Sequence, residues 1–219
     1  MSERQILLVE GPDDEHVIKA ICGRRSLPKI QEIHQCDGIE KLLEALPVRL
    51  KESDIGILGL VVDADINLLS RWDAIRYRLR DAGYTNLPAT PPSTGLVIHP
   101  PVETLLPKVG VWLMPNNLSA GILEDFLKFL IPDLDNNSLF SHATSAVNSI
   151  PATATRFSSV AKPKALIHTW LAWQEEPGRP LGQSITARFL DHDVPEVTIF
   201  ATWLSELFNF TVEPPATAT

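Results

Sequence analysis

Two aspartates separated by one residue follow a long apolar run near the centre of the first half of the chain. The run covers residues 55–62, and Asp63 and Asp65 come after it. Because side chains at i and i+2 of a strand point to the same side, both carboxylates can face one point at the strand's end. Like charges held this close repel unless one is protonated or a cation lies between them. Carboxylate oxygens are ligands that Mg²⁺ and Mn²⁺ prefer, so the pair predicts a site for one of these cations.

Glu10 occupies the same position after another apolar run, residues 5–9. A turn follows, and Asp13 or Asp14 can then cap the next helix. The alternative to a cation site is a structural role, because Asp65 can be the N-cap of the following helix. A single Asp-x-Asp pair is common, but acids that follow two separate predicted strands are less often found by chance. Metal binding is therefore the favoured interpretation.

The elements that would position these acids alternate between strand and helix. Apolar or alternating runs predict strands over residues 5–9, 29–35, 55–63, 95–99 and 109–114. Amphipathic runs predict helices over residues 14–23, 39–50, 68–82 and 122–130. This alternation is typical of a parallel sheet with right-handed crossovers, whose sites lie beyond the carboxyl ends of the strands. We expect an α/β fold with a mainly parallel sheet of about four strands, flanked by helices, with Glu10 and Asp63 at neighbouring strand ends.

The last third of the chain is predicted to be helical. Helices are expected over residues 139–147, 164–174, 183–191 and 195–208. We expect residues 1–135 to form the α/β domain, 136–211 a helical extension packed on it, and 212–219 a loose tail. The three tryptophans of this extension lie at helical spacing and are expected to be mostly buried rather than to stack on bases: Trp170, Trp173 and Trp203.

The composition is that of a globular protein. The 219 residues are 44% hydrophobic and 21% charged, which is enough to bury a core. The net charge of −8 counts against a plain DNA-binding module, although an enzyme with a local basic patch remains possible. Cys22 and Cys36 are too few for a disulfide framework and indicate a reducing compartment. With no signal-peptide pattern and no membrane-length apolar run, the expected location is cytoplasmic, with no membrane partner.

The acids form a pattern that resembles the Toprim domain, which is found in topoisomerases, primases, small RNA-maturation nucleases and OLD-family nucleases. The Toprim pattern has a Glu after the first strand and an Asp-x-Asp after a later one, here Leu-Leu-Val-Glu10-Gly and Val-Val-Asp63-Ala-Asp65. The local pattern Val-Glu-Gly-x-x-Asp, in which Asp14 lies four residues after Glu10, most resembles the OLD and small-nuclease branch. The layout is also similar to an uncharacterised family of stand-alone prokaryotic proteins related to Toprim. Many Toprim domains have a Gly shortly after the Asp-x-Asp, where this chain has residues 66–68, Ile-Asn-Leu.

The resemblance covers about residues 5–130 and implies a Toprim-like fold. It also implies a metal-dependent, nuclease-like enzyme that acts on phosphodiester bonds of nucleic acid. Glu10, Asp63 and Asp65 would hold Mg²⁺ or Mn²⁺ and carry the reaction, with Glu10 either as a ligand or as the general acid/base.

Other residues have weaker roles in the same interpretation. Ser119 and Glu124 fall where that branch has further metal-side acids, although Glu124 can equally be an acid that suits a helix N-terminus. Asp14 and Glu124 are expected to be weaker ligands of the cation. Phosphoryl transfer also needs a cation beside the phosphate, and Lys164 is favoured over Lys162 for that role. The Arg-rich face after Asp65 is expected to be a solvated helix surface.

Two alternatives stay open. The first is a metal-binding Toprim module without catalysis, acting as a regulatory or defence-system subunit beside a separate ATPase. The chain itself has no Gly-x-x-x-x-Gly-Lys-Ser/Thr motif for ATP. The second is a phosphatase of the Asp-x-Asp type or a receiver domain, but these place key aspartates after the first strand, where this chain has Glu10-Gly11. The sequence leaves the substrate open between DNA, RNA and a small phosphoester.

Overall fold

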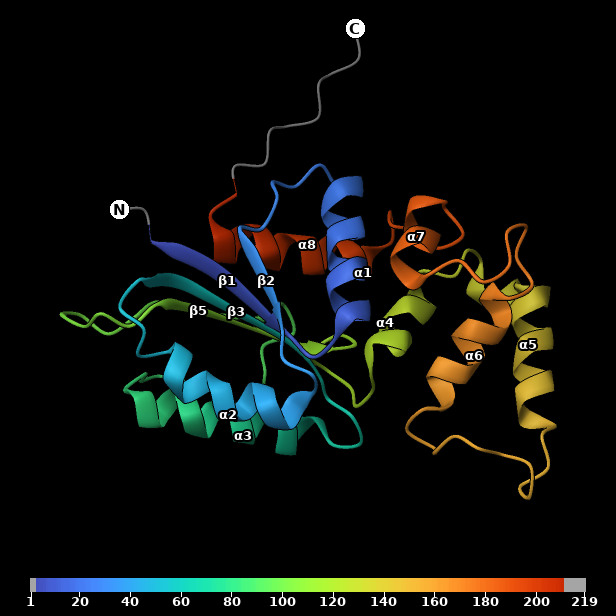
Figure 1. Cartoon of the computed structure of the whole chain (residues 1–219), viewed down its shortest axis with the longest axis horizontal. Helices are drawn as coiled ribbons and strands as arrows, with labels where there is room; N and C mark the ends of the chain where they lie inside the picture. Colours follow the sequence, from blue (N-terminus) through green and yellow to red (C-terminus); the bar gives the residue numbers. More distant parts are fainter. Residues whose placement is uncertain (1–2, 211–219) are drawn as a thin grey trace, which may run out of the picture.

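A five-stranded sheet forms the centre of the protein (Figure 1), in the order β2-β1-β3-β5-β4. The computed structural model describes residues 3–210. The strands are β1 (Arg4–Val9), β2 (Glu32–Gln35), β3 (Ile55–Asp63), β4 (Leu96–Ile98) and β5 (Lys108–Met114). Neighbouring strands run parallel except β4, which pairs antiparallel with β5 at the edge. The predicted mainly parallel sheet is confirmed, with five strands instead of about four.

Helices cover both faces of this sheet. They are α1 (Pro12–Arg24), α2 (Ile39–Arg49), α3 (Leu68–Ala82), α4 (Leu123–Phe129), α5 (Ser138–Asn148), α6 (Lys162–Leu171), α7 (Leu181–Thr186) and α8 (Pro195–Phe208), with a 3-10 turn at Leu134–Asn136. Figure 1 shows α2 and α3 along one face, and α1 and α8 along the other. Alternating residues of β1 follow this division: Ile6 and Leu8 join the core on the α2/α3 side, and Leu7 and Val9 join the core on the α1/α8 side.

Most helices and strands cover the residues over which they were predicted. Strand β3 and helices α3 and α8 have the predicted bounds. The helix predicted over residues 183–191 is shorter, because Arg188 adopts the left-handed conformation (φ 62°) soon after α7 ends. The loose tail predicted over residues 212–219 lies outside the described residues.

The C-terminal helices pack on the α/β part of the chain. Helix α8 shares a sheet face with α1, helix α7 packs on α1, and α5 and α6 pack on each other, with α6 also against α4. Trp170 and Trp203 are buried as predicted. The prediction is wrong for Trp173, which is 40% exposed because α6 ends at Leu171 and the chain turns there.

Helix α8 approaches the sheet closely at a pair of glycines. Gly59 of β3 and Gly110 of β5 are directly opposite each other, and Leu207 of α8 fills the space above both. A Cβ on Gly110 would lie 2.5 Å from the Leu207 Cδ2 atom, so a methyl group there forces the buried Leu207 side chain, or α8 with it, to shift.

We expect Gly110→Ala to lower the free energy of unfolding by about 1–3 kcal/mol, as overpacking of a tight core does. Urea denaturation followed by far-UV circular dichroism measures the change. Gly23→Ala in α1 is the matched control, since nothing lies within 4 Å of a Cβ at that position. It should leave stability unchanged or raise it by up to about 1 kcal/mol. Equal effects of both substitutions would contradict the close packing of α8.

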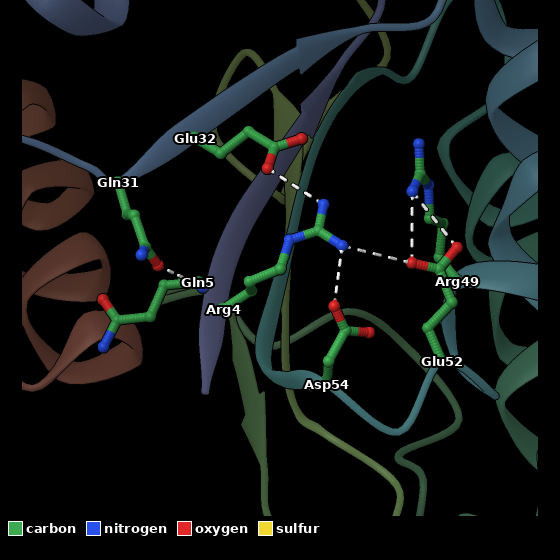
Figure 2. Close-up of polar contacts among 7 residues, drawn as sticks. All are labelled: Arg4, Gln5, Gln31, Glu32, Arg49, Glu52 and Asp54. Carbon is green, nitrogen blue, oxygen red and sulfur yellow. Dashed lines mark hydrogen bonds and ion pairs between the residues drawn. The ribbon is translucent and has the colours of Figure 1, made fainter. Parts of the chain in front are cut away.

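Charged side chains join the strands at the opposite end of the sheet from Glu10 (Figure 2). Arg4, which begins β1, donates to Glu32 and Asp54 at 3.0 Å each, and lies 3.6 Å from Glu52. Glu52 also accepts from Arg49. These partly exposed pairs hold the beginnings of β1, β2 and β3 together and contribute little to stability. They are a structural feature, separate from the predicted site.

Among residues 3–210, no helix has both the length and the apolar character needed to cross a membrane. Cys22 and Cys36 are free and buried.

Candidate functional site

Glu10 and Asp63 meet at the carboxyl end of the sheet. Strands β1 and β3 are neighbours, and Glu10 and Asp63 lie at their ends, so the predicted adjacency is confirmed. The Glu10 Oε1 atom accepts a hydrogen bond from the Asp63 backbone N–H at 2.8 Å. The Asp63 Oδ1 atom accepts from the Leu123 N–H at 2.9 Å, at the beginning of α4. These two contacts join both strand ends to α4.

Two further acidic side chains, from the first turns of two helices, lie near Glu10 and Asp63 at the carboxyl end of the sheet. Asp14 lies in the first turn of α1 and is 7% exposed, and Glu124 lies in the first turn of α4 and is 4% exposed. Asp14 also has a structural role, because its Oδ2 atom accepts from the Gly11 N–H at 2.9 Å. We define the acidic cluster as Glu10, Asp14, Asp63 and Glu124.

The acids of the cluster disfavour one another's ionised forms. Burial raises the pKa of Asp63 to about 9, and the nearby charges of Glu10, Asp14 and Glu124 act in the same direction. Burial likewise raises the pKa of Asp14 to about 7, with further contributions from Glu10 and Glu124. Burial also raises the pKa of Glu10, although the hydrogen bond from Asp63 opposes it. If all of its acids were ionised, the cluster would therefore carry more negative charge than its surroundings compensate, so it retains protons unless a cation binds.

Lys164, at the beginning of α6, lies beside the acidic cluster. Its Nζ atom is 3.4 Å from a carboxylate oxygen of Asp13 and 3.4 Å from one of Glu124. Partial burial works against its charge, yet Glu124 and Asp13 raise the pKa of Lys164 on balance. Because its side chain is half-exposed, Lys164 remains able to reach an anion that approaches from solvent. The side chain of Asp13, the other partner of this lysine, is 44% exposed.

Asp65 does not join the cluster in the way that strand alternation predicted. Strand β3 ends at Asp63, and Asp65 has the left-handed conformation (φ 53°), with its N–H bonded to the Gly121 carbonyl at 2.9 Å. Its carboxylate forms an ion pair with Arg71. Alternation applies only within a strand, so the side chain after Ala64 is no longer constrained to the same side. The N-cap alternative is also wrong, because Asn67 caps α3 by accepting from the Ser70 N–H at 2.9 Å.

Arg71 is the residue that sequence reasoning missed. Its Nε donates to the Asp63 carbonyl oxygen at 2.9 Å, and its Nη2 pairs with the Asp65 carboxylate. The expectation of a solvated arginine face is wrong at this position, where the side chain is only 15% exposed. A cation in the first turns of a helix opposes the helix dipole. That position, six residues after Asp65, was a signal that Arg71 needs a carboxylate partner.

The donor chemistry of the acidic cluster suits a hard divalent cation, which would remove the mutual repulsion of the acids. The arrangement is not preformed: within residues 3–210, no three His, Cys, Asp or Glu side chains already stand in metal-binding geometry. Asp65 is held by Arg71, and one oxygen of Asp63 is held by the Leu123 N–H. Cation binding at this place therefore requires carboxylates to rotate, and Asp65 joins only if Arg71 releases it.

Comparison with known proteins identifies the family but no activity. No curated protein and no solved structure matches the chain. A family profile described as "Protein of unknown function (DUF3226)" matches residues 4–209, which span all the strands and helices described above. The chain belongs to the DUF3226 family.

Proposed function

We propose that this protein is a Mg²⁺-dependent enzyme of the Toprim type that acts on phosphodiester bonds of nucleic acid. One observation carries the proposal: acids from two strand ends and two helix N-termini converge, and burial and mutual repulsion raise the pKa of Asp63 to about 9. Buried acids without compensation are costly to a fold, and they recur where a site holds a cation or moves a proton. The position beyond the carboxyl ends of parallel strands is where α/β proteins bind ligands.

Individual residues of the site have different roles in the proposed reaction. Glu10, Asp63, Asp14 and Glu124 would hold Mg²⁺ or Mn²⁺, and the cation, when bound, offsets phosphate charge and activates the attacking oxygen. Lys164 supplies a mobile positive charge beside the phosphate. Glu10, whose pKa burial raises, is either one of these ligands or the general acid/base of the reaction.

One observation favours the second candidate, a metal-binding module without catalysis that serves beside a separate ATPase. The Asp65 carboxylate pairs with Arg71 and not with the acidic cluster, so the two aspartates of the Asp-x-Asp pair do not face one point. A split pair binds a cation with fewer protein ligands and positions a reacting phosphate less firmly.

Cleavage assays separate the two candidates. We expect the wild-type protein to cleave plasmid DNA, single-stranded DNA or RNA with Mg²⁺ or Mn²⁺ present, and to lose that activity with a chelator or in Asp63→Asn. Removal of one metal ligand from a metal-dependent phosphodiesterase should lower the rate at least about a hundredfold. Asp81→Asn, the same change on an exposed aspartate of α3, should cleave at the wild-type rate. Metal binding with no turnover on any of these nucleic acids would support the module instead.

Replacement of Arg71 tests whether Asp65 is a latent metal ligand. In Arg71→Met the Asp65 carboxylate loses its partner and is free to bind the cation, so we expect Mg²⁺ affinity to rise roughly tenfold, or about 1.4 kcal/mol. Isothermal titration calorimetry measures the affinity. Arg76→Met is the matched control, since Arg76 lies in the same helix and pairs with Asp73 away from the cluster. Unchanged or weaker Mg²⁺ binding in Arg71→Met would remove Asp65 from the metal site.

A further inference from the structure

The outer edge of β2 is open to pairing with another strand. In the sheet, β2 is the border strand, and it lies beside α1 (Figure 1). The main chain of a border strand bonds its neighbour at alternate residues and points away at the others. Because the Cys36 N–H donates to the Val9 carbonyl at 2.9 Å, the main-chain groups of Ile33 and Gln35 point away from β1. Within residues 3–210, no hydrogen bond satisfies these outward groups.

This open edge lacks the protection that sheet borders usually have. At the opposite border, Trp203 of α8 covers β4, and its ring N–H donates to the Leu96 carbonyl at 2.9 Å. Strand β2 contains no proline, and its pairing with residues 6–9 is free of bulges. Its edge is therefore able to accept a short extended segment as a further strand.

A cavity of about 300 Å³ lies between this open edge and α1. Its lining includes the apolar side chains of Cys22, Leu27, Ile30 and Ile33 and the charged side chains of Lys19 and Lys29. No residue of the acidic cluster lines it, so it is separate from the candidate metal site. Ile33 packs on the α1 side of the sheet. Every second side chain of a segment added beside Ile33 would therefore point toward this cavity.

Basic residues predominate in the part of the chain that forms most of the cavity. Although the net charge of the protein is −8, residues 16–31 contain no Asp or Glu and four basic residues: Lys19, Arg24, Arg25 and Lys29. Lys19 pairs with Glu15, and Arg25 pairs with Asp193. Lys29 is exposed and has no ion-pair partner in the described part of the chain. This local excess of positive charge is complementary to an acidic ligand.

We propose that β2 and α1 dock an extended, acidic segment of a partner protein. The segment pairs its main chain with Ile33 and Gln35 and places an apolar side chain in the cavity, as in recognition by strand addition. Lys19 and Lys29 line the same cavity, so the acidic residues lie two positions before or after the apolar one, on the same face of the segment. The outward N–H and C=O groups favour a polypeptide over a nucleic acid, which has no matching row of such groups.

Short peptides test this docking site. The probe is Thr-Glu-Thr-Leu-Thr-Glu-Thr, in which the leucine and both glutamates share one face of a strand. The matched control, Thr-Glu-Leu-Thr-Thr-Glu-Thr, has the same composition, but its leucine points to the other face. Burial of one leucine side chain is expected to make the probe bind at least about tenfold more tightly than the control, measured by NMR titration. Bound probe should also slow hydrogen exchange of the Ile33 and Gln35 amides.

Two variants separate main-chain pairing from charge. Gln35→Pro removes an outward N–H, a change that edge strands tolerate, and should weaken probe binding about tenfold. Lys29→Glu reverses a charge beside the cavity and should weaken binding at least about threefold. Lys51→Glu, at an exposed lysine that does not line the cavity, should leave binding unchanged. Circular dichroism verifies that each variant is folded, and amide exchange in the wild type tests strand pairing without any substitution.

Three results would overturn the proposal. The first is equal binding of probe and control, or no binding of either at about 1 mM. The second is unchanged exchange of the Ile33 and Gln35 amides when the probe is bound. The third is tighter binding of a thymidine heptanucleotide than of the probe, which would assign the basic segment to nucleic acid. All three are measured without Mg²⁺, so they leave the proposed metal-dependent function to its own tests.

Discussion

Mg²⁺ or Mn²⁺ should raise the melting temperature of the wild-type protein, and Asp63→Asn should abolish the rise. A cation that binds only the folded state stabilises it by about 2.7 kcal/mol at a hundred times its dissociation constant. For a chain of this size, each kcal/mol shifts the melting temperature by roughly 2–4 °C, so the expected rise is about 5–10 °C. Differential scanning calorimetry at several metal concentrations measures it.

The metal-free proteins provide the control for this experiment. An asparagine at position 63 can keep the oxygen that accepts from the Leu123 N–H, and it cannot ionise against the charges of Glu10, Asp14 and Glu124. We therefore expect metal-free Asp63→Asn to be at least as stable as the wild type. Asp81→Asn should retain the full metal response. If Asp63 is purely structural, the wild type will show no response to metal.

The second large effect is on the pH dependence of stability without metal. An acid whose pKa is higher in the folded than in the unfolded state binds its proton more tightly when folded. Its contribution to stability is complete below its unfolded pKa, near 4, and is lost as the pH rises through its folded pKa. The folded values are about 7 for Asp14 and about 9 for Asp63. Stability should therefore fall between pH 5 and pH 9 by several kcal/mol, at about 1.4 kcal/mol per unit of pKa difference.

Urea denaturation in a chelating buffer at pH 5, 7 and 9 measures this fall. Asp63→Asn should flatten the profile, because one of the titrating groups is gone and the repulsion on Asp14 is smaller. Saturating Mg²⁺ should reverse the trend above pH 7, since the cation binds the ionised carboxylates. A metal-free wild type that is most stable at pH 8 would show that the acids are already compensated.

The sheet could be predicted from the sequence because its long apolar runs are typical of buried parallel strands. Residues 57–62 are all buried between β1 and β5, and only a central parallel strand needs so continuous an apolar run. Adjacent positions of Glu10 and Asp63 followed from the order of strands and helices. The division at residues 135/136 stays a prediction, and the core on the α1/α8 side takes residues from both of its parts.

The details of the site depend on contacts that periodicity does not encode. The left-handed conformation of Asp65 and its bridge to Gly121 come from a loop distant in sequence, and they redirect its carboxylate to Arg71. The same limit applies at Trp173, where helical spacing predicted burial but the helix ends two residues earlier. Glu124 and Lys164 meet only because α6 packs on α4, a contact between segments that no local pattern connects.

Crystals soaked in Mn²⁺ provide the most direct test that the acidic cluster is a metal centre. Anomalous diffraction locates the cation independently of any assay. The expected result is one strong peak bonded at roughly 2.0–2.3 Å to carboxylate oxygens of Glu10 and Asp63, as hard-cation coordination requires, and absent in Asp63→Asn crystals. A peak elsewhere, or a wild-type cluster that stays metal-free at saturating Mn²⁺ while its acids keep their present hydrogen bonds, would contradict it.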